Sequence, residues 1–82
     1  MPNKTKAMAL DRIKDLNQVY QHGNVVEWES PQGQRYRYER DRGAVGRELD
    51  AVKPLHEWYV LEKNDLTHAK RRVFDLINED EL

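Results

Sequence analysis

The side chains that could do chemistry in this 82-residue chain are few and far apart. Its three histidines, His22, His56 and His68, lack the one-turn spacing of a metal-binding histidine pair. The absence of cysteine excludes disulfides, a thiolate nucleophile and zinc bound through sulfur. Ser30 is the only serine, and it lies in a predicted turn. The sequence therefore predicts neither a metal site nor a nucleophilic enzyme.

Carboxylates and glycines also form no recognisable site. The acidic residues stand beside basic ones, which lowers their pKa values instead of placing one near neutrality for acid–base catalysis. The glycine-containing segment 43–46 lacks the Lys-Ser/Thr pair of a phosphate-binding loop. We therefore expect a protein that is not an enzyme and that binds no cofactor.

The basic residues suggest nucleic-acid binding as a hypothesis. Residues 35–42 combine arginine with tyrosine, and such side chains contact phosphates and stack on bases. A wider basic set would form if the end of this run and the C-terminal helix converge in space: Arg40, Arg42, Arg47, Lys70, Arg71 and Arg72. However, 14 basic and 15 acidic residues give a net charge of −1, which does not indicate non-specific nucleic-acid binding. Nucleic acid is therefore the alternative partner.

The clearest structural signal is a β-hairpin over residues 24–41. The segment from Ser30 to Gly33 is typical of a type I turn, in which the left-handed glycine closes a G1 bulge. This three-residue loop pairs Ser30 with Gln34. The register then predicts two cross-strand pairs on an apolar face and two on a charged face: Trp28 with Tyr36, Val26 with Tyr38, Glu29 with Arg35, and Glu27 with Arg37.

The remaining elements are predicted from the spacing of apolar residues. Intervals of three and four predict a helix over residues 7–22, ended by Gly23, and a second over residues 66–78. Residues 42–53 have the spacing of a short helix that Pro54 ends. Residues 57–63 alternate aromatic and aliphatic side chains before the capping-type Asn64 and Asp65, which favours a third strand. One long helix over residues 54–79 is the alternative.

These elements predict an α+β fold in one small domain. The expected order is helix, β-hairpin, short helix, third antiparallel strand and C-terminal helix, with the helices packed on the sheet. The domain covers residues 7–79, between a flexible tail at residues 1–6 and a frayed acidic end at residues 80–82.

The hypothesis for the function is based on the predicted third strand. Trp58 and Tyr59 would face opposite sides of it, and in so small a domain one of them could remain exposed as an anchor for a partner. We therefore expect a small binding module of the regulator or inhibitor type, which acts by protein–protein contact or self-association. No apolar run reaches the length of a membrane span and the start lacks a signal peptide, which indicates a cytoplasmic protein.

Overall fold

The computed structural model describes residues 10–80. Within these residues, five strands form one antiparallel sheet in which each strand pairs with its neighbours in the chain. The strands are β1 (Asn17–His22), β2 (Val25–Glu29), β3 (Arg35–Glu39), β4 (Ala44–Asp50) and β5 (Leu55–Val60). A short 3-10 helix, η1 (Ile13–Asp15), precedes the sheet, and the helix α2 (Leu66–Asp80) follows it. The α+β class is thus confirmed, with more strands and fewer helices than the sequence predicts.

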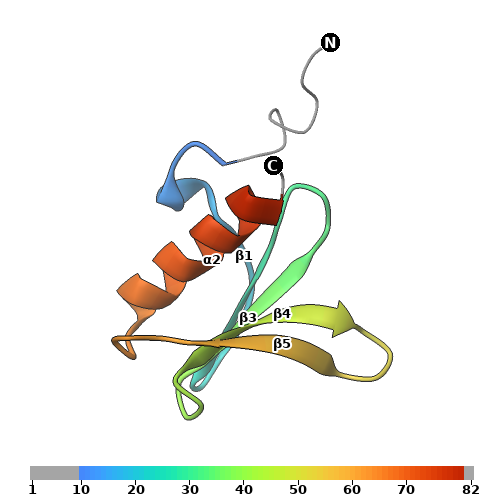
Figure 1. Cartoon of the computed structure of the whole chain (residues 1–82), viewed down its shortest axis with the longest axis vertical. Coiled ribbons are helices and arrows are strands. Elements are labelled where there is room, and N and C mark those ends of the chain that lie inside the picture. The colour runs from blue at the N-terminus through green and yellow to red at the C-terminus, as the bar shows by residue number, and fades with distance from the viewer. Residues whose placement is uncertain (1–9, 81–82) are drawn as a thin grey trace.

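The helix α2 crosses one face of the sheet, and the opposite face has no helix over it among residues 10–80 (Figure 1). We call these the helix face and the open face. The core lies between α2 and the helix face and consists of Val26, Trp28, Tyr36, Tyr38, Val45, Ala69, Val73, Leu76 and Ile77. Burying a large apolar side chain stabilises a fold by roughly 1.5–3 kcal/mol, so Trp28 and Tyr36 are major contributors in so small a domain.

The predicted β2–β3 hairpin is confirmed in all four cross-strand pairs. The Ser30 amide donates a hydrogen bond to the Gln34 carbonyl (2.8 Å), and the Gly33 amide donates to the Ser30 carbonyl (2.9 Å). Gly33 has a φ of 92°, the left-handed conformation that the turn requires. Trp28 and Tyr36 are buried on the helix face, as the register predicts.

The predicted helix over residues 7–22 is wrong in the part that the structure describes. Only Ile13–Asp15 is helical, as a single 3-10 turn, and Asn17–His22 forms the edge strand β1. Gly23 is left-handed (φ 58°), but it turns the chain into the β1–β2 hairpin instead of ending a helix. The free edge of β2 offers ladder hydrogen bonds to this segment, and these outweigh a weak helical periodicity.

The predicted short helix over residues 42–53 is also wrong, because Ala44–Asp50 forms strand β4 in the interior of the sheet. Gly43 is left-handed (φ 66°) and closes the β3–β4 turn. Val45 is buried on the helix face, where it pairs with Tyr38 on one side and Tyr59 on the other. Pairing on both sides overrides a helical spacing that two glycines already weaken.

The predicted third strand exists as the fifth strand, Leu55–Val60, and the alternative of one long helix is wrong. The helix α2 starts separately, as the carboxylate of Asp65 accepts a hydrogen bond from the His68 amide (2.8 Å) in the manner of an N-cap. Asn64 ties the preceding loop to the β3–β4 turn by donating to the Arg40 carbonyl (2.9 Å). The predicted tail at residues 1–6 and the end at 81–82 lie outside the described residues.

Candidate protein-binding surface

Strand β5 holds both of the aromatic residues that the sequence predicts as partner-binding, and it places them on opposite faces of the sheet. Tyr59 pairs with Val45 and lies on the helix face, whereas Trp58 pairs with Gly46 and lies on the open face. Both side chains are partly buried. The alternation of a β-strand therefore presents one aromatic ring on each side of the same edge strand.

On the open face, Trp58 is held in a stack of side chains. The guanidinium carbon of Arg42 lies 4.0 Å from the centroid of the Trp58 ring, a close cation–π contact. The ring centroids of His56 and Trp58 are 5.1 Å apart. Beneath the indole lies Gly46, where a β-carbon would come within 2.8 Å of the ring. Trp58 thus leans inward over β4, away from the outer edge of β5.

A network of ion pairs joins this stack to β2 and β3. Glu27 accepts hydrogen bonds from both Arg35 and Arg37, and Glu39 accepts them from Arg37 and Arg42. Burial disfavours the ionised form of Glu39, but hydrogen bonds from Arg42 and Arg37 outweigh it and hold its pKa below the ordinary value. The charged groups of the open face therefore largely neutralise one another.

On the helix face, Tyr59 packs against the core and contacts charged residues from two elements. Burial raises the pKa of Tyr59, and its hydrogen bond to Glu57 raises it further. Glu57 also accepts a hydrogen bond from Arg47 (3.2 Å). The guanidinium carbon of Arg72, on α2, lies 4.9 Å from the centroid of the Tyr59 ring. Within residues 10–80, the contact recorded for the Arg72 guanidinium is this cation–π contact with the Tyr59 ring.

The outer edge of β5 is the most unusual part of this surface. The Leu61 amide donates to the Gly43 carbonyl (2.9 Å), and hydrogen-bonded pairs alternate along an antiparallel ladder. The backbone groups of Glu57 and Tyr59 therefore point toward β4, whereas those of His56, Trp58 and Val60 point away from the sheet. Leu55 and Val60, at the two ends of the strand, are 54% and 83% exposed.

A groove of about 340 Å³ lies where β5 ends beside α2. Its lining comes from the end of β5, the following loop and one side of α2: Val60, Leu61, Glu62, His68, Arg71, Arg72 and Asp75. Arg71 is paired with Asp75 (3.4 Å), and His68 contacts Asp65 (2.7 Å). The groove therefore combines two apolar side chains with charges of both signs.

The basic residues of the nucleic-acid hypothesis do not gather on one face. Arg42 lies on the open face, whereas Arg47 and Arg72 contact Tyr59 on the helix face. Arg40 is an exposed turn residue, and Arg71 is paired with Asp75. Lys70 is a partly buried residue of α2. Since the set is divided between two faces and interleaved with carboxylates, it forms no continuous track for a phosphate backbone.

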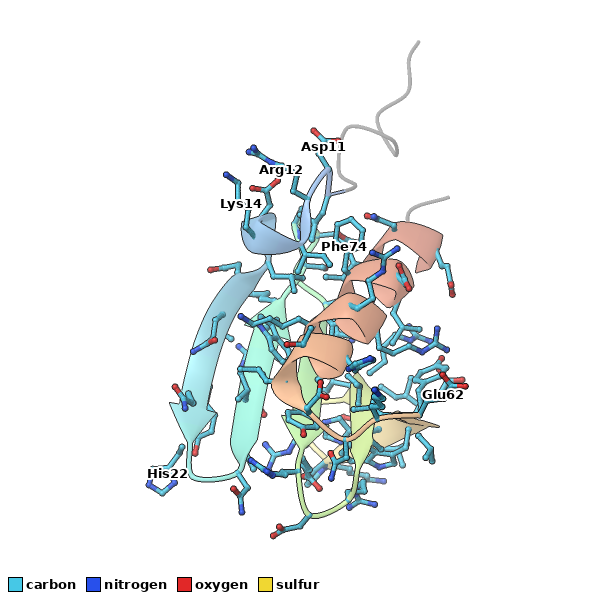
Figure 2. The ribbon with its side chains drawn as sticks, turned by 90° about the vertical axis from the view of Figure 1, so that its left-hand side faces the viewer. Asp11, Arg12, Lys14, His22, Glu62 and Phe74 are labelled. Atoms are coloured by element: carbon cyan, nitrogen blue, oxygen red, sulfur yellow. The ribbon has the colours of Figure 1, made fainter. Side chains whose placement is uncertain are left out.

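The histidines lie in separate places as well. His22 lies at the tip of the β1–β2 hairpin, on the other side of the molecule from Glu62 and the groove (Figure 2). Within the described range, no group of three or more His, Asp or Glu side chains could hold a metal ion. None of the helices within residues 10–80 has the length and hydrophobicity that a membrane-spanning helix needs.

Comparisons with known protein families, curated proteins and solved structures return no match for this chain. Sequence reasoning identifies Trp58 and Tyr59 but misses the roles of Gly46 and Arg42, which β4 and its turn bring to Trp58. A glycine within a run of strand-forming residues is the signal that could have indicated a large side chain packed on the neighbouring strand.

Proposed function

We propose that this protein is a small non-enzymatic module that binds other polypeptides by strand addition along β5. In this mode an extended segment of the partner extends the sheet, and its backbone supplies most of the hydrogen bonds. The observation that carries the proposal is the regular outward edge of β5. Among residues 10–80 no strand pairs with this edge, the backbone groups of His56, Trp58 and Val60 point outward from it, and the Val60 side chain is 83% exposed.

Residues along β5 support this role. Proteins commonly protect an edge strand with lysine, proline or a bulge, because an open edge invites pairing with another chain. The segment Leu55–Val60 has neither lysine nor proline. Its one acidic residue, Glu57, lies on the helix face and is paired with Arg47. The irregularity of the β4–β5 ladder falls between Glu48 and Asp50, beside Leu55, so the register from His56 to Val60 is uninterrupted.

The other edge strand, β1, is a poorer template. Its ladder with β2 shifts between Gln18 and Tyr20, which marks a bulge in the middle of the strand. A bulge increases the local twist and interrupts the row of backbone groups that an added strand needs. The β1 edge therefore serves as an internal comparison for β5.

A non-enzymatic role agrees with the ionisable groups near β5. Hydrogen bonds from Tyr59 and Arg47 hold the pKa of Glu57 below its ordinary value. Hydrogen bonds from the amide and side chain of His68 do the same for Asp65. General acid–base catalysis works best with a pKa near the operating pH, and these shifts go in the opposite direction.

Affinity capture from cytosol with edge variants tests the proposal. Val60→Asp places a charge at the β5 edge, and Val52→Asp makes the same change at a similarly exposed position in the β4–β5 turn. Val19→Asp makes it on β1. We expect a protein retained by the wild type to be lost with Val60→Asp and kept with the other two variants. Retention by all three variants, or loss with Val19→Asp alone, would contradict the role of β5.

A further inference from the structure

We infer that one occupant of the β5 edge is a second copy of this chain, added antiparallel to β5 across a two-fold axis at Trp58. Two sheets would then join into one continuous sheet of ten strands. This inference rests on the proposed function, since it names a partner for the same edge, and it is supported by the register, the exposed residues and the charges of β5.

The outward backbone groups select the register. Hydrogen-bonded pairs across the new edge must form between residues whose amide and carbonyl point outward, namely His56, Trp58 and Val60. A two-fold axis at Trp58 pairs Trp58 with itself and His56 with Val60 of the second copy. No other symmetric register pairs all three residues within Leu55–Val60. An axis at Glu57 would also oppose two like charges, which is unfavourable.

On the helix face, this register brings opposite charges together. Glu57 comes opposite Tyr59 of the second copy, and the Arg72 guanidinium of that copy lies 4.9 Å from the centroid of the Tyr59 ring. Each Glu57 would then lie between its own Arg47 and Arg72 of the second copy. Directly opposed residues on one face of an antiparallel pair have Cβ atoms about 4.5–5.5 Å apart, which is within reach of both side chains.

On the open face and at the strand ends, the register covers the most exposed apolar groups of β5. Val60 comes opposite His56, and Leu55 comes opposite Leu61 of the second copy. Val60 and Leu55 are 83% and 54% exposed in the single chain. Trp58 leans over Gly46, away from the edge, so two copies of its ring can approach the axis without occupying the same space.

The first test is molecular mass in solution, by sedimentation equilibrium over a wide range of protein concentration. We expect a shift from 9.8 kDa toward twice that mass as the concentration rises. Val60→Asp should keep the protein at the monomer mass, whereas Val52→Asp should behave as the wild type. Circular dichroism checks that each variant is folded. A wild type that stays monomeric throughout, or a dimer unaffected by Val60→Asp, would overturn the inference.

A cross-linking test addresses the register. The chain has no cysteine, so His56→Cys and Val60→Cys each introduce a single thiol. The predicted register places these two positions opposite each other, within the roughly 4.4–6.8 Å between Cα atoms that a disulfide allows. Under mild oxidation, a mixture of the two variants should form a disulfide dimer. Each variant alone should not, because identical positions would lie four residues apart, or about 13 Å.

The opposite cross-linking result would rule out the predicted register. Disulfide dimers that form from either variant alone, and that form no more readily when the two variants are mixed, would refute the axis at Trp58. A monomeric wild type combined with cytosolic capture that depends on Val60 would refute the second copy as partner, while the proposed function would stand. Capture that is indifferent to Val60 would refute the proposed function.

Discussion

The indole of Trp58 packs closely against Gly46, its cross-strand partner on β4. A β-carbon at Gly46 would come within 2.8 Å of ring atoms Cε3 and Cζ3, and within 3.1 Å of the Cβ of His56. Such packing covers a strand glycine with an aromatic ring from the next strand and fixes the position of Trp58 on the open face. The close approach explains why a residue that ordinarily weakens strands occupies the middle of β4.

Replacing Gly46 by Ala should therefore destabilise the fold, although alanine is ordinarily favoured over glycine within regular structure. The added methyl group displaces a ring that Arg42 also holds, and overpacking of this kind costs about 1–3 kcal/mol. Chemical denaturation measures the change in the free energy of unfolding.

The control is the same substitution in a Trp58→Ala background. Without the ring, Gly46→Ala should cost little or become stabilising, so the two changes should be strongly non-additive. Additive costs would show that the indole does not lie where this structure places it.

Gly33→Val should reduce the free energy of unfolding by about 1 kcal/mol or more, because a β-branched residue resists a φ of 92°. Steric crowding would not cause this loss, since the atom nearest to a β-carbon at Gly33 would be a carboxylate oxygen of Glu29, at 3.9 Å. The matched comparison is Gly23→Asn, at a φ of 58° that asparagine tolerates, where we expect a small loss. Thermal or urea unfolding of both variants measures the difference, and equal losses would be evidence against conformational strain.

The ion pairs of the open face should contribute unequally to the free energy of unfolding. Arg35 pairs in register with Glu29, yet its guanidinium bonds to Glu27 (3.2 Å), which also accepts from Arg37. Glu27→Gln should therefore cost about 1 kcal/mol, whereas Glu29→Gln should change the stability by less than about 0.5 kcal/mol. Urea denaturation of both variants at low and high salt tests this ranking. A larger loss with Glu29→Gln would mean that Arg35 bonds its directly opposed residue in solution.

Stability should fall in acid partly through Glu39. The folded state holds the pKa of Glu39 below its ordinary value of 4.5, so folding favours the ionised carboxylate. The stabilisation is complete above about pH 4.5 and disappears as the pH falls through the lower pKa of the folded state. Unfolding free energies measured from neutral pH downward should fall less steeply for Glu39→Gln than for the wild type. Parallel curves would contradict a lowered pKa at Glu39.

The hairpin could be predicted from the sequence because its information is local. The turn from Ser30 to Gly33 sets the register, and the alternation of Trp28 and Tyr36 with charged residues assigns the two faces. The helix α2 is similarly local, with a capping residue at Asp65 and a regular apolar stripe.

Strands β1 and β4 could not be predicted, because their pairing decides their structure. The segment Asn17–His22 is exposed along its whole length, so it carries no buried alternation to reveal a strand. In β4, Gly46 lowers the local strand signal and has its role only through Trp58, twelve residues further along the chain. For the proposed site, the placement of Trp58 and Tyr59 on opposite faces of one strand could be predicted from their alternation. The edge position of that strand could not, because it depends on the order of the whole sheet.

The most direct test of strand addition at β5 is amide hydrogen exchange, measured residue by residue with and without the bound partner. In the free protein, the amides of Glu57 and Tyr59 should exchange slowly and those of His56, Trp58 and Val60 quickly. Binding should slow these three amides together and leave the β1 edge unchanged. Partner binding that leaves the three amides in fast exchange would contradict strand addition at β5.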